Sequence, residues 1–252
     1  MIRNLSRHSI CAATAIVAGV DAMPCFAQGY TVGGSRPSQN SKIKLHAELA
    51  SANDRHVISL PKLGLAFPAH PALELGVDAQ LRHIDEPGKR RVAGIGDLEL
   101  KAKYLLIDGR SSRAGIDASA ELKISLPVGN EQRGFGEGQP AIKLPITFSR
   151  RHGPWEFGGM VGGQLVYRRN KAMLLAGALV TRELGGGVKV GAEIATEMRY
   201  KKPGHQELMA NLGVRLRPSS KSELFLIAGR SLESRHGAPV TRIKLGFEII
   251  LD

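Results

Sequence analysis

Asp97-Leu-Glu-Leu-Lys-Ala-Lys-Tyr-Leu-Leu-Ile107 decides the fold, because apolar and charged residues alternate along its first eight positions. The charged positions are Asp97, Glu99, Lys101 and Lys103. An extended strand places alternate residues on opposite faces, whereas a helix would scatter these charges around its circumference. The stretch therefore predicts a β-strand with one apolar and one charged face.

The same alternation recurs from residue 42 to the end of the chain, in about twelve segments separated by turn residues. The segments are 42–50, 55–67, 71–83, 95–108, 113–126, 139–150, 153–168, 171–183, 187–201, 205–217, 221–233 and 238–251. Many exceed the five or six residues of an average soluble strand and reach the nine to eleven that a tilted membrane-spanning strand needs. An even number of antiparallel strands is typical of bacterial membrane barrels.

Alternation alone fits two architectures, because a soluble sandwich turns its apolar faces inward and a membrane barrel turns them outward. Strand length and the nearly continuous charge on the polar face favour the barrel. We predict one antiparallel transmembrane β-barrel over residues 41–252, with the charged face lining a lumen. The residues expected to line the lumen and contact solute are Glu99, Lys101, Lys103, Glu121, Lys123, Glu193, Arg199 and Arg215.

The first 27 residues have the three regions of a secretory signal peptide. Arg3 and Arg7 precede an apolar run over 10–20, and Ala27 provides a small residue for cleavage. The run is too short to cross a bilayer as a helix. Both cysteines lie in this segment, so no disulfide is expected in the exported chain. Residues 28–40 are polar, rich in glycine and serine, and lack periodicity, which predicts a short flexible leader.

The formal net charge of +12 indicates a polyanionic partner. Much of the positive charge lies in connections between strands, which we expect to bind the phosphates of lipopolysaccharide on the outer side of the membrane. The residues expected to do so are Lys89, Arg90, Arg91, Arg168 and Arg169. Ordinary solvated loops are the alternative for each cluster. No base-reading motif is present, so nucleic acid is not an expected partner.

Two stretches show a resemblance to a known family. They are Gly94-Ile-Gly-Asp-Leu-Glu-Leu-Lys-Ala-Lys-Tyr104, and Glu121-Leu-Lys-Ile-Ser-Leu-Pro-Val-Gly129 followed by Gly134-Phe-Gly-Glu-Gly138. Both resemble the outer-membrane barrel family named for the meta-pathway of phenol degradation, whose members are described as transporters. The resemblance implies an outer-membrane channel for small compounds, including aromatic ones.

No catalytic, nucleotide-binding or metal-binding motif accompanies this pattern, and neither enzymatic activity nor a cofactor is expected. We predict an outer-membrane channel of a didermic bacterium that passes small solutes by diffusion through a charged lumen. Two alternatives remain. Twelve strands are few enough for side chains to close the lumen, which would leave a structural or lipopolysaccharide-binding barrel. An outer-membrane lipid hydrolase could use His46 or His56 with a serine from another strand. The sequence predicts neither the solute nor the oligomeric state.

Overall fold

The computed structural model describes residues 30–52, 55–167, 171–200, 206–234 and 238–251. The predicted signal peptide over 1–27 lies outside the described residues. Strands and their connections account for nearly all of the described chain, with one short 3-10 helix, η1 (Glu131–Arg133). Among the described residues, no helix has the length and apolar character needed to cross a membrane.

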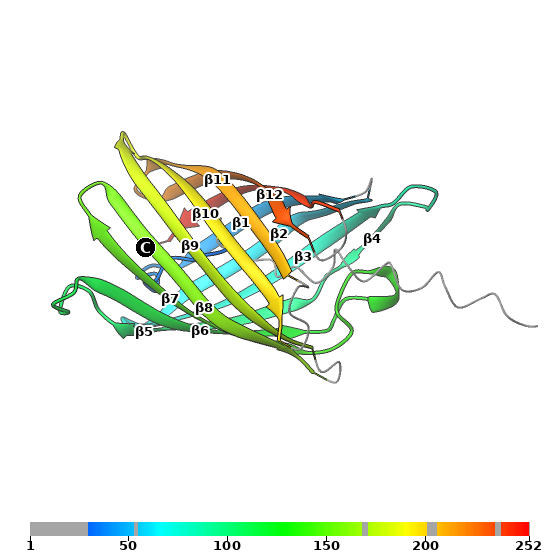
Figure 1. The fold of residues 1–252 in the computed structure, drawn as a ribbon, viewed down its shortest axis with the longest axis horizontal. Coiled ribbons are helices and arrows are strands. Elements are labelled where there is room, and N and C mark those ends of the chain that lie inside the picture. The colour runs from blue at the N-terminus through cyan, green and yellow to red at the C-terminus, as the bar shows by residue number, and fades with distance from the viewer. Residues whose placement is uncertain (1–29, 53–54, 168–170, 201–205, 235–237, 252) are drawn as a thin grey trace, which may run out of the picture.

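The strands form one closed antiparallel barrel (Figure 1). They are β1 (Lys42–Ala52), β2 (Arg55–His70), β3 (Leu73–Asp85), β4 (Val92–Ile95), β5 (Leu98–Ile107), β6 (Ile116–Leu126), β7 (Ala141–His152), β8 (Trp155–Val166), β9 (Lys171–Gly185), β10 (Val188–Arg199), β11 (Gln206–Ser219), β12 (Ser222–Glu233) and β13 (Thr241–Ile250). Consecutive strands pair, and β13 pairs with β1 to close the ring. The short β4 pairs with β3 beyond the end of β5. The strands β4 and β5 therefore together occupy one of the twelve strand positions around the barrel. The predicted fold of about twelve strands is confirmed.

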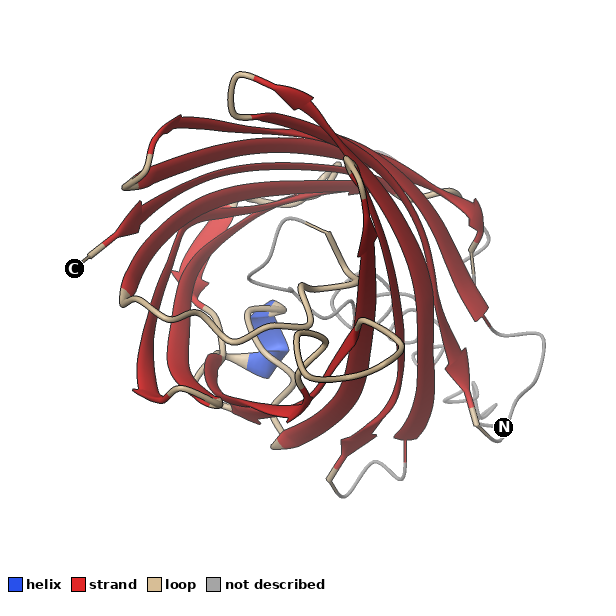
Figure 2. Cartoon of the chain, turned by 90° about the vertical axis from the view of Figure 1, so that its left-hand side faces the viewer, coloured by secondary structure: helices blue, strands red, loops and turns tan. Residues whose placement is uncertain are grey.

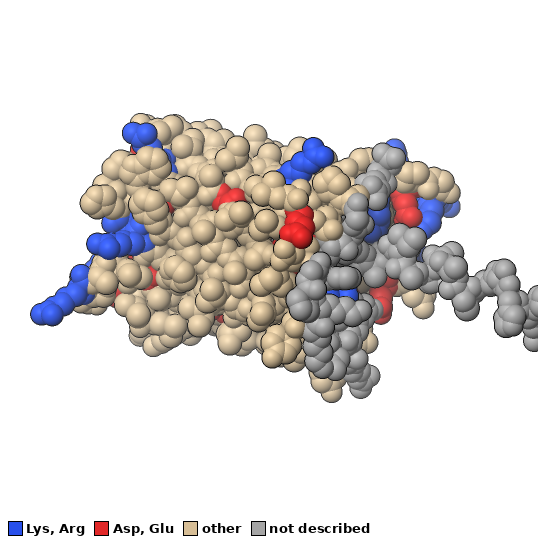
Figure 3. Space-filling view, viewed as in Figure 1, with Lys and Arg blue, Asp and Glu red and all other residues tan. Residues whose placement is uncertain are grey.

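The alternation seen in the sequence becomes the difference between the outside and the inside of the barrel. Apolar side chains point outward, as Leu100 does with 40% of its surface exposed, whereas Lys103 in the same strand is only 1% exposed. On the face shown in Figure 3 the band between the two ends of the barrel is largely uncharged. A contiguous apolar surface of this kind is unusual on a protein that is surrounded by water.

The two ends of the barrel differ in their connections. One end, here the turn end, carries connections 71–72, 108–115, 153–154, 186–187 and 220–221, together with the start of β1 and the end of β13. The opposite end, here the loop end, carries connections 86–91, 127–140 and 234–240, and 127–140 is the longest connection at either end. At the turn end, Gly186 and Gly187 have φ of 59° and 76°, a backbone conformation that glycine adopts without strain.

Residues 30–40 lie inside the barrel, in the region predicted to be a leader. Tyr30 packs against Phe225 and Ile227, and Val32 packs against Met160 and Leu175. Figure 2 shows chain segments and η1 within the ring of strands. The segment is thus part of the barrel interior, which its polar, aperiodic sequence did not indicate.

Candidate functional site: the occupied lumen

Glycines on four neighbouring strands make room for the N-terminal segment. Gly158, Gly177, Gly191 and Gly213 occupy interior positions of β8, β9, β10 and β11. We call this set the glycine groove. A Cβ atom on Gly177 would lie 2.6 Å from Val32, and one on Gly191 would lie 2.7 Å from the Tyr30 hydroxyl. Glycine within a strand often marks such a close approach of another segment.

Hydrogen bonds to the backbone of the segment hold it across the lumen. The Val32 N–H donates to Glu193 Oε2 at 2.5 Å, and Asn211 Nδ2 donates to the other oxygen of that carboxylate at 2.6 Å. From the opposite wall, Lys103 Nζ donates to the Gly34 carbonyl at 3.0 Å. A carboxylate of the wall thus accepts a hydrogen bond from a backbone N–H, and a lysine of the wall donates one to a backbone carbonyl. The lumen therefore binds this segment through its main chain.

Side chains of the segment add further contacts with the wall. The Tyr30 hydroxyl donates to the Gly213 carbonyl at 3.0 Å, and burial raises the pKa of Tyr30 to about 12. Ser35 shares a 2.5 Å hydrogen bond with Ser149, and its carbonyl accepts a hydrogen bond from Ser119.

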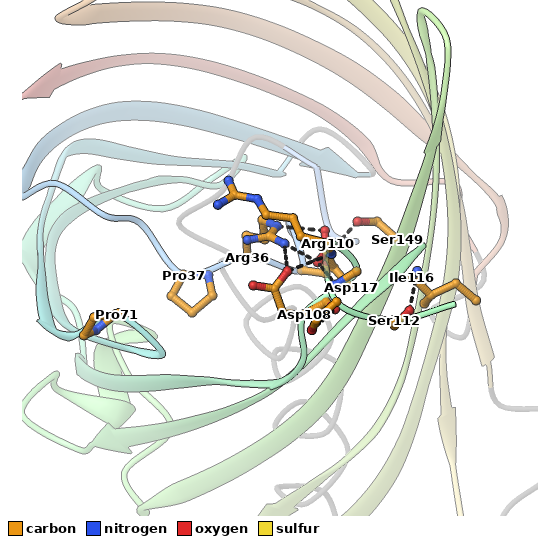
Figure 4. Close-up of polar contacts among 12 residues, drawn as sticks. Arg36, Pro37, Pro71, Asp108, Arg110, Ser112, Ile116, Asp117 and Ser149 are labelled. Atoms are coloured by element: carbon orange, nitrogen blue, oxygen red, sulfur yellow. Dashed lines mark hydrogen bonds and ion pairs between the residues drawn. The ribbon is translucent and has the colours of Figure 1, made fainter. Parts of the chain in front are cut away.

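Arg36 fastens the segment to the turn end (Figure 4). Its guanidinium makes a paired contact with Asp117, with Nε 2.9 Å from Oδ2 and Nη2 2.7 Å from Oδ1, and Nη2 also contacts Asp108. The hydrogen bond to Asp117 raises the pKa of Arg36. The pKa of Asp108 is lowered, first by the backbone N–H of Arg110 and also by Arg36. A cavity of about 410 Å³ opens beside this cluster, lined in part by Arg36, Arg110 and Asp117.

Five of the residues predicted to line the lumen form one cluster of ion pairs on β5 and β6. Glu121 lies 3.9 Å from Lys103 and 3.4 Å from Lys123. Lys101 contacts Asp78 on β3 and lies 3.4 Å from Glu99. The positive and negative charges of this cluster therefore neutralise one another within the wall.

The other three predicted residues lie away from this cluster. Glu193 holds Val32, as described above. Arg215 on β11 lies 3.1 Å from Glu223 on β12. Arg199 is half-buried at the loop end of β10, apart from the other seven.

The connection over 127–140 folds inward from the loop end. Phe135 is 2% exposed and packs against Val57 and Ile84. Arg82 donates to the carbonyls of Gly134 and Phe135 at 3.3 and 3.4 Å.

Asp97 fastens the same connection from the junction of β4 and β5. Its carboxylate accepts the N–H groups of Gly129 and Glu137 at 3.0 and 2.8 Å, and burial raises its pKa. The connection over 127–140 is therefore held at several points, and it narrows the lumen from the loop end.

The basic clusters predicted to bind phosphate are described only in part. In the loop over 86–91, Lys89 lies 2.8 Å from Glu86, and Arg91 lies 2.8 Å from Asp85. These cations already have carboxylate partners, although exposed pairs of this kind are weak enough for a phosphate to compete. Arg168 and Arg169 lie outside the described residues.

The two histidines considered for a hydrolase lie in different surroundings. His46 Nε2 lies 3.8 Å from Glu248 and has no hydrogen-bond partner in the described part of the chain, and the ring meets Phe225 edge-on at 5.1 Å. His56 pairs in register with Ser51 and Asp85 on the neighbouring strands. Across the described ranges, no group of three or more His, Cys, Asp or Glu residues could hold a metal ion.

Tyr30, Val32 and Arg36 are the site residues that the sequence did not predict. The usable signal lies in the wall, because interior positions of four successive strands are glycine where a lumen-facing polar residue was expected. Recognising that pattern requires knowing which residues of each strand face the lumen.

No protein-family model matches the sequence, and no curated protein matches it. Solved structures do match. A COG4313 outer membrane channel from Pseudomonas putida F1 is 15% identical, with a TM-score of 0.66, and the match covers 85% of this chain and 96% of that one. The NanC porin is 7% identical with a TM-score of 0.58, covering 83% and 100%. The KdgM porin in complex with disordered oligogalacturonate is 9% identical with a TM-score of 0.56, covering 84% and 99%. The fold is thus that of outer-membrane channels and porins.

Proposed function

We propose that this protein is an outer-membrane channel for small solutes whose lumen is closed by its own N-terminal segment. The observation that carries the proposal is the way residues 30–40 are held. They cross the lumen on hydrogen bonds to wall side chains such as Glu193 and Lys103 and do not pair with any strand edge as a further strand of the sheet. Water or solute can replace such contacts without breaking the hydrogen bonds between strands that close the barrel.

Export, membrane placement and orientation are part of the same proposal. The apolar exterior needs lipid, and the fold is one that spans membranes with strands. Residues 1–27 are proposed to be removed after export to the outer membrane of a didermic bacterium. Short turns face the periplasm in such barrels, so the turn end is periplasmic and the loop end is external. There the basic loop over 86–91 would meet lipopolysaccharide.

Small aromatic compounds are the solutes we propose. The family resemblance implies them, and the wall supplies a place for an aromatic ring. The phenol of Tyr30 lies between Phe225, Ile227 and two glycines, with the Gly213 carbonyl as acceptor. A free phenolic solute could occupy this place when the segment leaves it.

Planar-bilayer conductance of the refolded mature protein tests the proposal. The full protein should give small or infrequent current steps, and a variant lacking residues 30–40 should give larger and steadier ones. Heat-dependent mobility in gels establishes that the deletion variant is folded. Absence of steps from both folded proteins would instead favour a permanently closed structural barrel. A mature protein that stays soluble without detergent would contradict the membrane placement.

A further inference from the structure

The exterior of the barrel carries very little charge along its strands. At outward-facing positions within the described strands, the lysine and arginine residues are Arg150, Arg182 and Arg230. One acidic residue, Asp85, sits at the last position of β3 and pairs with Arg91. A cationic side chain in lipid is costly unless it reaches the interface and an anion there.

Two of these arginines flank an aromatic pair at the turn end. Arg150 on β7 is opposite Phe157 on β8, and Trp155 on β8 is opposite Arg182 on β9. The guanidinium carbon of Arg182 lies 5.1 Å from the centre of the Trp155 ring, within reach of a cation–π contact. The Trp155 and Phe157 rings stack with centroids 6.4 Å apart. Three adjacent strands thus present two cations around an aromatic platform.

Nothing in the described chain neutralises these cations. No carboxylate within the described ranges forms an ion pair with Arg150 or Arg182. The nearest acids in sequence, Glu156 and Glu183, occupy inward positions and pair with Lys189 at 3.1 and 3.3 Å. The described part of the chain therefore supplies no counter-ion to Arg150 and Arg182.

We propose that Arg150, Arg182 and Trp155 form a binding site for the phosphate of an anionic glycerophospholipid. Tryptophan favours the level of the lipid headgroups, which places the two guanidinium groups where phosphates lie. Each guanidinium can donate paired hydrogen bonds to phosphate oxygens. The site rests on the proposed membrane placement, in which the turn end faces the leaflet made of phospholipid. The matched arginine at the loop end, Arg230, faces the other leaflet.

The single tryptophan of the chain reports directly on this site, since Trp155 is the only one in the sequence. The full mature protein is reconstituted in vesicles of phosphatidylcholine with a small fraction of brominated phosphatidylglycerol or brominated phosphatidylcholine. Bromine quenches tryptophan fluorescence at close range. Brominated phosphatidylglycerol should quench more strongly, and high salt should reduce the difference.

Substitutions identify the residues responsible. Arg150→Gln and Arg182→Gln should each reduce the preference for phosphatidylglycerol about fivefold, and the double variant should abolish it. Arg230→Gln is the matched control and should leave it unchanged. Loss of the preference in Arg230→Gln would show a general charge effect and overturn the site.

The remaining outcomes separate this inference from the proposed function. Equal quenching of the unaltered protein by both brominated lipids would overturn the phosphate site while leaving the membrane placement intact. Absence of quenching by either lipid would contradict the membrane placement itself. Relief of quenching when lipopolysaccharide replaces part of the phosphatidylcholine, with the fraction of brominated phosphatidylglycerol unchanged, would show that the site prefers lipopolysaccharide phosphates, and the assignment to phospholipid would be wrong.

Discussion

Glu193 on β10 accepts the backbone N–H of Val32 at 2.5 Å, so a buried carboxylate of the barrel wall holds the chain that precedes the first strand. Asn211 orients the same carboxylate from β11. The site therefore joins two parts of the same chain, the barrel wall and the segment over 30–40. The strength of this contact can be measured by how often the lumen opens.

Glu193→Ala should open the channel more often. A hydrogen bond to a charged group contributes about 2 kcal/mol, so its loss should shift the balance between docked and undocked segment about 30-fold. Single-channel recording measures the open fraction. Glu223→Ala is a suitable control, because that lumen glutamate pairs with Arg215 and Arg217 and not with the segment. Equal effects of both substitutions would indicate general loosening of the wall.

Gly177→Ala should displace Val32 from the glycine groove. The added Cβ atom would lie 2.6 Å from Val32 and 3.2 Å from the Ile194 carbonyl, and overlaps of this kind cost about 1–3 kcal/mol. Hydrogen exchange of residues 30–40 should become faster, while exchange in the strands changes little. Gly163→Ala provides the comparison, because its nearest neighbour outside the adjoining residues would be 3.7 Å away. Unchanged exchange in the segment of Gly177→Ala would contradict the observed packing.

Acid should release the segment through Asp108. The pKa of this carboxyl is lowered in the folded protein by the Arg110 N–H and by Arg36. Its ion pair with Arg36 therefore stabilises the docked segment at every pH above the ordinary carboxyl pKa, and the stabilisation disappears as the pH falls through the lowered value. Channel opening should rise in that acidic range.

Asp108→Asn tests this dependence. It should raise the open fraction at neutral pH and flatten the acid-induced increase. Asp85→Asn removes an ion pair with Arg91 at the loop end and should change neither. An acid-induced increase of full size in Asp108→Asn would assign the transition to other carboxylates.

The sequence predicted the barrel well, because a period of two persists over strands such as β5 and β6 and places Lys103 and Glu121 on the inner face. Which of these charges would be available to solute could not be predicted. Pairing of Glu121 with lysines on two strands depends on the register between strands, which alternation within one strand does not specify. Residues 30–40 form no regular element, so their place in the lumen follows from contacts distant in sequence, such as Val32 with Glu193.

Titration of Tyr30 tests the docked state in solution. Burial raises its pKa from 10.0 to about 12, so the hydrogen bond to the Gly213 carbonyl is fully present below the ordinary value and is lost as the pH rises through about 12. The chain has four tyrosines, and subtracting the tyrosinate absorbance of Tyr30→Phe from that of the unaltered protein isolates this one. The difference curve should have its midpoint near 12.

The same curve distinguishes a docked segment from a displaced one. In Gly177→Ala, which changes no charge, the midpoint should fall towards 10.0, because a displaced tyrosine regains water and its phenolate is no longer disfavoured by burial. Gly163→Ala should keep the high midpoint. If the unaltered protein already titrates near 10.0, the segment is outside the lumen under those conditions, and closure by residues 30–40 is not the resting state of the channel.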